Sequence, residues 1–332
     1  MEILLYTIVF LLLLVVSNVT NRLLPQLPLP LVQIVLGISL GFLLPQGKFH
    51  LDTELFLALV IGPLLFREAE ESNITSILKH WRIILFLIFP VIFISTLGLG
   101  YLAHLLWAAL PLAACIAVGA ALGPTDLVAF ASLSERFSFP KRVENILKGE
   151  GLLNDASGLV AFRVALLAWT TGSFSLGKAS ISLVLSIIGG FAIGMLSAGL
   201  NRWLHKLLMS AQVSDIASEL LLELSLPLVT FFLAEEIHVS GIIAVVVAGI
   251  FKASRFKRIT LLEAQVDSVT ETIWNTVNFM LNGSVFIILG IELEMITEPI
   301  LKSPIYDNLL LLVSIVLLTF LLFVLRFVML CT

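Results

Sequence analysis

Apolar residues follow one another along this chain in long runs, which short polar segments separate. The runs cover residues 3–21, 28–45, 53–70, 82–107, 112–134, 143–170, 178–201, 216–236, 240–252, 268–291 and 307–330. A helix of about 20 apolar residues is long enough to cross the hydrocarbon core of a bilayer. The pattern therefore predicts an all-α polytopic membrane protein with about eleven spans, packed as one transmembrane domain over residues 1–332.

The composition supports a membrane protein over a soluble one. Of the 332 residues 59% are hydrophobic and 13% are charged, whereas about a quarter of the residues in soluble domains are charged. The two cysteines lie within apolar runs, which indicates neither a disulfide framework nor a metal site. No basic pattern indicates a nucleic-acid partner, and we expect no cofactor. The first run lacks a basic leader and a cleavage site, so we expect it to be retained as a span.

Lysine and arginine are unevenly distributed between alternate loops. One side contains Arg22, Lys79, Arg82, Arg136, Lys141, Arg142, Arg202, Lys206, Lys252, Arg255, Lys257 and Arg258. The other side contains Lys48, Lys178 and Lys302. Cytoplasmic loops carry the excess of basic residues in multi-pass proteins. We therefore expect a multi-pass protein of the plasma membrane with its amino terminus outside.

The fifth run contains the sequence Gly-Pro-Thr-Asp at residues 123–126. Pro124 removes a backbone donor and clashes with the carbonyl one turn back, so the helix should break or kink there. Broken helices within a membrane expose carbonyls and helix ends to transported ions. A carboxylate in a span is costly unless it has a partner or a bound ion. Thr125 and Asp126 are candidate ion ligands, although a plain kink beside a water pocket would give the same pattern.

The sixth run reads Gly-Glu-Gly-Leu-Leu-Asn-Asp-Ala-Ser-Gly from residue 149. At helical spacing Gly151, Asp155 and Gly158 share one face, and the glycines allow another backbone to approach Asp155 closely. Glu150 and Asn154 lie on the adjacent stripe. An asparagine alone is enough to hold two helices together, but a neighbouring aspartate within a membrane indicates a binding site.

Other charges within the runs need partners. Arg326 lies deep in the last run, and Arg163 lies eight residues after Asp155 in the sixth. A buried arginine stays ionised, so each should pair with a carboxylate. We expect Glu150 to pair with Arg326, which leaves Asp155 available for an ion. The charged residues 67–71 close the third run, and most of them are expected to form a solvated helix end.

These motifs together resemble the monovalent cation:proton antiporters of the sodium/proton exchanger type. The match rests on Gly-Pro-Thr-Asp-Leu-Val-Ala-Phe in the fifth run and Gly-Glu-Gly-Leu-Leu-Asn-Asp in the sixth. The resemblance implies an inverted-repeat fold with discontinuous helices. It places Thr125, Asp126, Asn154 and Asp155 in the ion site, and it implies that Na⁺ binds at Asp155 and Thr125. The stretch Gly-Pro-Leu-Leu-Phe-Arg-Glu at residues 62–68 resembles the segment of that family that adds an acidic residue to the site, here Glu68.

The resemblance also has departures. Gly151 stands where the family has serine, and Leu127 replaces the proline that follows Thr-Asp. The family has thirteen spans, whereas about eleven are expected here, so we expect the chain to be truncated at its carboxyl end. Glu150 and Arg326 match a structural ion pair of the family. The family further implies a homodimer in the lipid bilayer.

The resulting hypothesis is electroneutral exchange of Na⁺, or of Li⁺ or K⁺, for H⁺, serving pH and sodium homeostasis. Burial disfavours the charged form of Asp155 and a nearby cation favours it, so a proton and a sodium ion would compete for one carboxylate. Asn154 stands where electrogenic relatives carry a second aspartate, which indicates one proton per sodium.

Two other hypotheses fit part of the pattern. An intramembrane aspartyl protease would use Asp126 and Asp155 as a dyad that shares one proton. That class carries Gly-x-Gly-Asp at one aspartate, whereas residues 123–126 here read Gly-Pro-Thr-Asp. The third hypothesis is a truncated remnant that does not transport. The antiporter hypothesis, in which the chain is not an enzyme, accounts for both motifs.

Overall fold

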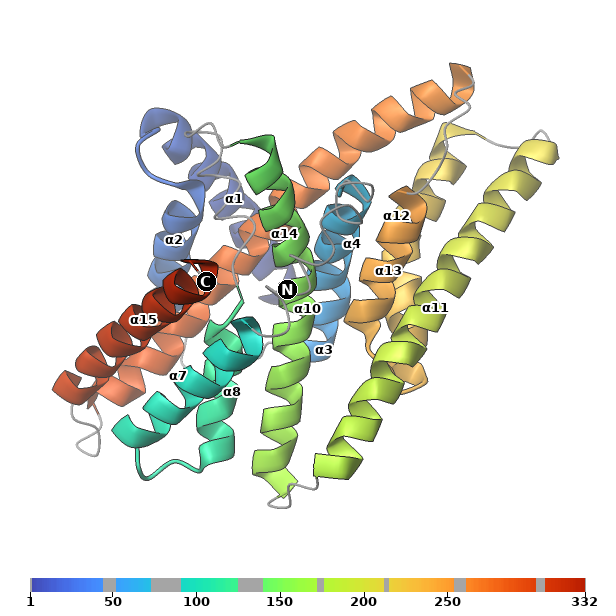
Figure 1. Cartoon of the computed structure of the whole chain (residues 1–332). Helices are drawn as coiled ribbons and strands as arrows, with labels where there is room; N and C mark the ends of the chain where they lie inside the picture. The colour runs from blue at the N-terminus through green and yellow to red at the C-terminus, as the bar shows by residue number, and fades with distance from the viewer. Residues whose placement is uncertain are drawn as a thin grey trace.

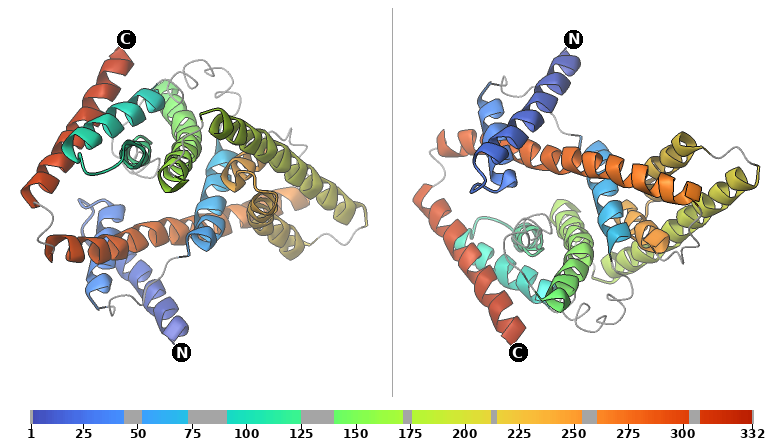
Figure 2. Two further views of the ribbon diagram at one scale, coloured as in Figure 1. Left: turned by 90° about the horizontal axis from the view of Figure 1, so that it is seen from below. Right: turned by 90° about the horizontal axis from the view of Figure 1, so that it is seen from above.

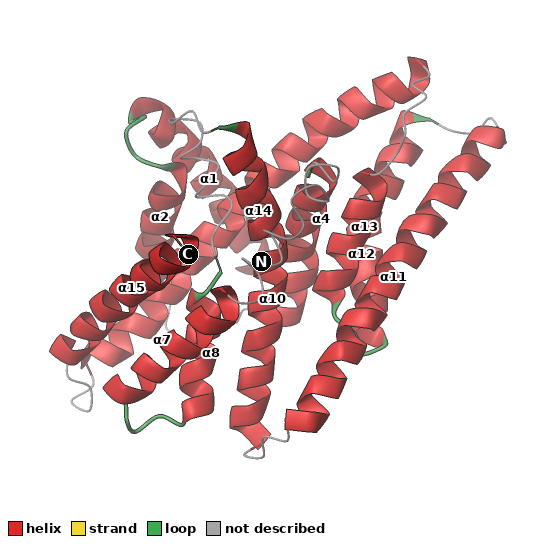
Figure 3. Ribbon diagram, viewed as in Figure 1, coloured by secondary structure: helices red, strands yellow, loops and turns green. Residues whose placement is uncertain are grey.

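The computed structural model describes residues 2–43, 52–72, 91–124, 140–171, 176–211, 215–253, 261–302 and 308–331. Within these ranges the regular structure is helical and contains no strand (Figure 3). The helices, labelled as in Figure 1, are α1 (Glu2–Leu23), α2 (Leu29–Leu43), α3 (Thr53–Phe56), η1 (Leu57–Ile61), α4 (Gly62–Glu71), α7 (Ile92–Leu106), α8 (Leu112–Leu122), α10 (Lys141–Thr171), α11 (Leu176–Ser210), α12 (Ile216–Glu236), α13 (Gly241–Ala253), α14 (Leu261–Lys302) and α15 (Asn308–Cys331).

Each apolar run predicted from the sequence contains helix, so the all-α prediction is confirmed. Four described helices are long and apolar enough to cross a membrane, namely 185–210 of α11, α12, 268–297 of α14 and 309–328 of α15. The described parts of six further apolar helices are shorter. Helix α14 spans 42 residues, far beyond the predicted 268–291, because its polar ends continue the helix outside the apolar stretch.

The helices form two groups that pack mainly within themselves (Figure 2). The α10 bundle consists of α7, α8, α10 and α15, in which α8 packs on both α7 and α10. The α13 bundle consists of α1, α2, α4, α11, α12, α13 and α14, in which α13 packs on α4, α11 and α12 while α14 packs on α2. Helix α10 lies at the boundary and makes small contacts with α4, α11 and α13.

Small residues bring the helix backbones within each bundle close together. A Cβ atom added at Gly290 of α14 would lie 2.9 Å from the Cα of Gly37 in α2. A Cβ added at Gly119 of α8 would lie 2.8 Å from the backbone N of Gly100 in α7. Between membrane helices, small residues replace the hydrophobic effect with close van der Waals packing. The sequence of each bundle therefore specifies close helix pairs.

A π turn interrupts the third predicted span. The segment η1 joins α3 to α4, and the N–H of Gly62 donates to the carbonyl of Leu57, five residues earlier. Pro63 follows directly; its ring has no N–H and would clash with the carbonyl one turn back in a regular α-helix. A π turn widens the helix at such a point. The sequence pattern predicted a continuous span here and did not show this turn.

Caps fix both ends of α12. The Asp215 carboxylate accepts a hydrogen bond from the N–H of Ser218 at 2.9 Å. At the other end the N–H of His238 donates to the carbonyl of Glu235 at 2.9 Å, and that of Val239 to Ala234 at 3.0 Å. His238 has a φ of 61°, so these bonds form the left-handed cap known as a Schellman motif.

Candidate functional site

Helix α8 ends at the Gly-Pro pair of the fifth run. The helix stops at Leu122, and Gly123 is its cap. Pro124 follows and has no N–H to continue the hydrogen-bond ladder. The end of α8 therefore lies where the proline predicts a break. Thr125 and Asp126 lie outside the described residues.

Helix α10 carries the polar sequence of the sixth run against this break. The backbone of Asn154 and Asp155 lies near the middle of α10. A Cβ added at Gly158 would lie 3.1 Å from Cδ of Pro124 and closer still to Cγ. The close approach predicted for the glycine face is thus present at Gly158. It places the backbone of Asp155 about one turn of α10 from the contact with the end of α8.

Arg326 of α15 reaches both of these helices. Its Nη1 lies 3.8 Å from Oε1 of Glu150, whose side chain is 6% exposed. Its Nη2 donates a hydrogen bond to the carbonyl oxygen of Gly123, the cap of α8. Carbonyl groups at the end of a helix have no partner within the helix and carry partial negative charge. The guanidinium therefore lies between a buried carboxylate and the end of α8.

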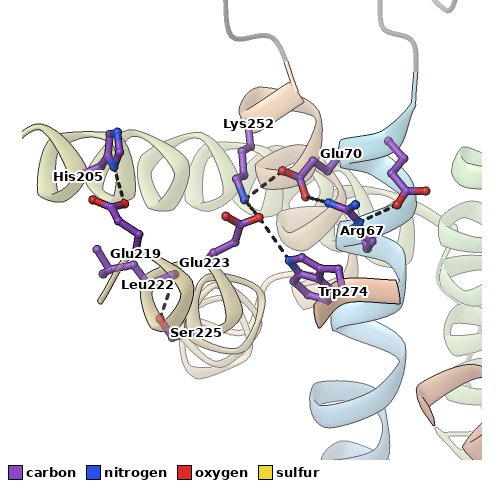
Figure 4. Close-up of polar contacts among 10 residues, drawn as sticks. Arg67, Glu70, His205, Glu219, Leu222, Glu223, Ser225, Lys252 and Trp274 are labelled. Carbon is purple, nitrogen blue, oxygen red and sulfur yellow. Dashed lines mark hydrogen bonds and ion pairs between the residues drawn. The ribbon is translucent and has the colours of Figure 1, made fainter. Parts of the chain in front are cut away.

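Three charged residues of α4, Arg67, Glu70 and Glu71, belong to a network of ion pairs (Figure 4). Arg67 contacts Glu70 at 3.0 Å and Glu71 at 2.7 Å. Lys252, in the last turn of α13, contacts Glu70 at 3.0 Å and also Glu223 of α12. We call Arg67, Glu70, Glu71, Glu223 and Lys252 the charge network. Apart from Glu71, each side chain in it is at most 16% exposed.

Aromatic rings complete the surroundings of the charge network. The indole N–H of Trp274 in α14 donates to Glu223 at 3.3 Å. The Trp274 ring lies 5.8 Å from the Arg67 guanidinium carbon, and the Phe66 ring lies 5.5 Å from Lys252 Nζ. Cations at such distances from a ring face are attracted by its quadrupole. The network thus joins α4, α12, α13 and α14 into one unit.

This network corrects the expectation that most of residues 67–71 form a solvated helix end. The sequence shows the charges of α4 but not that Lys252 and Glu223 meet them, because the partners come from helices far apart in the chain. A lysine at the end of a span commonly extends its charged end toward water. Here Lys252 instead extends between two carboxylates. No feature of the sequence distinguished these two outcomes.

Glu68 lies on α4 next to the charge network and is partly buried. Helix α4 touches α10, the helix of Asp155. The structure thus brings α4, which carries Glu68, into contact with α10, which carries Asn154 and Asp155. The end of α8 packs on α10 as well. It leaves the placement of Thr125 and Asp126, and hence the proposed protease dyad, outside the described residues.

A second pair of polar contacts was not foreseen from the sequence. The Nδ1 atom of His205 in α11 lies 2.5 Å from Oε2 of Glu219 in α12 (Figure 4). Arg202, one turn earlier in α11, donates to the carbonyl of Phe251 in α13 at 3.2 Å. These contacts join the ends of three helices of the α13 bundle. In the sequence these residues lie at the ends of predicted spans, and that position does not reveal which residues they contact.

The sequence model of one protein family, the transmembrane sodium/hydrogen exchangers, matches residues 7–332 of this chain. The sodium, potassium, lithium and rubidium/H⁺ antiporter of Bacillus subtilis (strain 168) is 38% identical over 328 residues, which cover 98% of this chain and 49% of that protein. The uncharacterized Na⁺/H⁺ exchanger YjcE of Escherichia coli (strain K12) is 34% identical over 314 residues, which cover 92% of this chain and 56% of that protein. The chain spans about half the length of the curated relatives it matches.

A solved structure shows the same fold. The sodium proton antiporter MjNhaP1 from Methanocaldococcus jannaschii at pH 8 superposes with a TM-score of 0.70 over 96% of this chain and 77% of that chain. Its sequence is 19% identical, so the likeness concerns the fold. The helical antiporter fold expected from the motifs is confirmed. Because the family model matches nearly the whole chain, the chain belongs to the sodium/hydrogen exchanger family of multi-pass membrane antiporters.

Proposed function

We propose that this protein exchanges Na⁺, or Li⁺ or K⁺, for H⁺ across the plasma membrane by electroneutral alternating access. The observation that carries the proposal is the placement of the Gly-Glu-Gly-Leu-Leu-Asn-Asp sequence on α10, packed through Gly158 on Pro124 at the end of α8. Membership of the sodium/hydrogen exchanger family supports it. The Bacillus subtilis relative is a sodium, potassium, lithium and rubidium/H⁺ antiporter, which supports exchange of an alkali cation for a proton.

Asp155 is the proposed carboxylate that binds the cation or the proton. Asn154 and Thr125 supply neutral oxygen atoms, Asp126 adds negative charge, and Glu68 extends the site from α4. Na⁺ is proposed to bind at Asp155 and Thr125. The packing of α10 on α8 and its contact with α4 support this grouping, because α10 carries Asn154 and Asp155, α4 carries Glu68, and Thr125 follows the end of α8 in the chain.

Competition for one carboxylate accounts for exchange. A proton or a sodium ion neutralises Asp155, and a neutral site crosses the low-dielectric region at lower cost than a charged one. With Asn154 in place of a second acid, one proton leaves for each sodium that binds. The ion-binding helices then move against the rest of the protein, as in other inverted-repeat transporters.

Glu150 and Arg326 are proposed to form a structural ion pair beside the site. Their 3.8 Å separation and the hydrogen bond from Arg326 to the carbonyl of Gly123 support this role. The guanidinium would offset the charge of Glu150 and hold the end of α8. This arrangement leaves Asp155 to bind the transported ion.

The remaining proposals concern the surroundings of the protein. Residues 1–332 form one transmembrane domain, with the amino terminus outside, that works as a homodimer in pH and sodium homeostasis. Large apolar side chains are exposed along the helices, among them Leu12, Phe42, Phe191, Phe320 and Phe323. Exposed apolar side chains on membrane helices face lipid or another protein. This surface supports contact with the bilayer.

Sodium-driven proton flux in proteoliposomes tests the proposal, with Asp155→Asn as the decisive variant. The substitution keeps the size of the side chain and removes its charge and its titratable proton, so exchange should be lost while the protein still folds. Glu271→Gln is the matched control, because it makes the same change on an exposed position of α14. Exchange that persists in Asp155→Asn would contradict the site. Cleavage of a membrane peptide by the same preparation, without sodium-driven flux, would support the protease instead.

A further inference from the structure

An exposed ion pair joins the helix of Asp155 to the α13 bundle. The Nη1 atom of Arg163 in α10 lies 3.4 Å from Oε1 of Glu235 in α12. The two side chains are 44% and 36% exposed. Arg163 follows Asp155 by eight residues on the same helix, which corresponds to about 12 Å along the axis. The pair therefore lies well away from the proposed ion but on the element that would carry it.

Two hydrogen bonds within the α13 bundle involve Glu235. Its Oε1 atom also accepts a hydrogen bond from the N–H of Gly241, the first residue of α13, at 3.1 Å. Its backbone carbonyl accepts from the N–H of His238 within the Schellman motif. The cap fixes the backbone of Glu235, and the hydrogen bond from Gly241 orients its carboxylate. Arg163 thus meets a preorganised acceptor on the turn between α12 and α13.

The packing around α10 is uneven. On one side α10 packs closely on α8, with Gly158 against Pro124. On the other side it makes small contacts with α4, α11 and α13. Among the described helices, α10 therefore makes little packing contact across the boundary between the two bundles. An ion pair across such a boundary contributes a larger share of what holds the two sides together than it would inside a bundle.

We propose that Arg163 and Glu235 form a latch that holds the α10 bundle against the α13 bundle in the arrangement seen here. Arg163 is then a positioning residue for the ion site, and this role rests on the proposed function in taking α10 as the helix that carries the ion. Transport needs α10 to move against its surroundings. A contact made in one arrangement and absent from the other shifts the populations by its own free energy. For a pair this exposed, the shift is about two- to fivefold.

Spin-label distances in lipid nanodiscs test the latch without requiring transport. Labels at Thr170→Cys of α10 and Phe232→Cys of α12 report the separation of the bundles, because both side chains are exposed. Cys115 and Cys331 are replaced by alanine in every sample. Arg163→Gln and Glu235→Gln should each lower the ratio of the close to the separated population about two- to fivefold. Glu235→Gln keeps an oxygen that accepts from the N–H of the α13 helix start, so it removes the charge and leaves the cap.

The control is Glu236→Gln, which removes the same charge one residue away. Glu236 is exposed and makes no ion pair with any residue that the structure describes. The double variant Arg163→Gln/Glu235→Gln should shift the ratio no further than either single variant. Unchanged distances in Arg163→Gln, an equal shift in Glu236→Gln, or shifts that add in the double variant would each overturn the latch.

Transport gives a second, separable measurement. In proteoliposomes the apparent sodium constant should change about two- to fivefold in Arg163→Gln and in Glu235→Gln and stay unchanged in Glu236→Gln. If the unmodified protein carries no sodium-driven flux, the proposed function fails, while the distances still decide whether the latch exists. If flux is present and both latch variants transport and separate like the unmodified protein, the latch alone fails.

Discussion

The α10 and α13 bundles hold their largely buried charges in different ways. In the α13 bundle Lys252 lies between Glu70 and Glu223, and Glu223 also accepts from Trp274. In the α10 bundle Arg326 lies 3.8 Å from Glu150 and donates a hydrogen bond to the carbonyl oxygen of Gly123. In the first region each charged group except Glu71 has two polar partners, and the ion pairs are 3.0 Å or shorter. In the second region the ion pair of Arg326 is longer, at 3.8 Å, and lies beside the end of α8.

This difference indicates which bundle is fixed and which can rearrange. A buried network in which each charge has several partners is costly to disrupt, because losing one member leaves others uncompensated. A looser pair beside a helix end tolerates small shifts in position at lower cost. The α13 bundle thus has the contacts of a rigid scaffold. The longer ion pair of the α10 bundle is typical of an element that can rearrange.

Removing the lysine of the charge network should have the largest effect on stability. Lys252→Met keeps much of the side-chain volume but leaves two largely buried carboxylates, Glu70 and Glu223, without their shared ammonium. We expect the free energy of unfolding in mixed micelles to fall by about 3–5 kcal/mol. Lys206→Met is the control, because Lys206 is an exposed lysine of α11. Equal stability of the two variants would remove the contrast between the bundles.

The pair in the α10 bundle should have a smaller effect. Glu150→Gln and Arg326→Gln should each lower the free energy of unfolding by about 1–3 kcal/mol, because the pair is longer and the arginine is partly exposed. The double variant should recover part of the combined loss, since neither charge is then left alone. A double-mutant cycle measured by the same unfolding method gives the coupling. Losses that simply add would show that the two residues are not partners.

The smallest effect is expected at the cap of α12, outside both charged regions. The hydrogen bonds from Ser218 lower the pKa of Asp215 below its ordinary value of 3.8. A carboxyl whose pKa is lowered by folding adds stability above its ordinary pKa and loses it as the pH falls through the lowered value. Asp215→Ala should therefore melt slightly lower than the unmodified protein at neutral pH, and the difference should shrink in acid. Asp215→Asn should keep most of the cap. A melting difference that grows as the pH falls would contradict this reading.

The spans, and the positions of several structural breaks and close contacts within them, could be predicted from the sequence. The apolar runs predicted the helices, because the length and the hydropathy of a segment indicate whether it can cross a bilayer. Gly158 was foreseen as a point of close approach, since a residue without a side chain at helical spacing from Asp155 has a clear structural meaning. The proline at residue 124 likewise marked the end of α8.

Contacts between distant segments could not be predicted in the same way. Arg163 was expected to have a carboxylate partner, but nothing in the sequence selected Glu235. The charges of Lys252 and Glu223 were visible, whereas their meeting with α4 depends on how four helices pack. The π turn before Pro63 also escaped notice, because a helix can absorb a proline by a kink, a break or a wider turn. The placement of Thr125 and Asp126 stays a prediction.

The central claim is that one carboxylate, Asp155, binds either sodium or a proton. Its most direct test is the apparent sodium constant of exchange in proteoliposomes across a pH series, with and without an imposed membrane potential. If the two ions share the site, the constant should rise about tenfold for each unit that the pH falls on the acidic side, because one proton must leave before one sodium binds. It should level off in alkali, and the potential should leave the rate nearly unchanged. A sodium constant that stays flat across the acidic range would contradict the shared site, and a strong dependence on voltage would contradict one-for-one exchange.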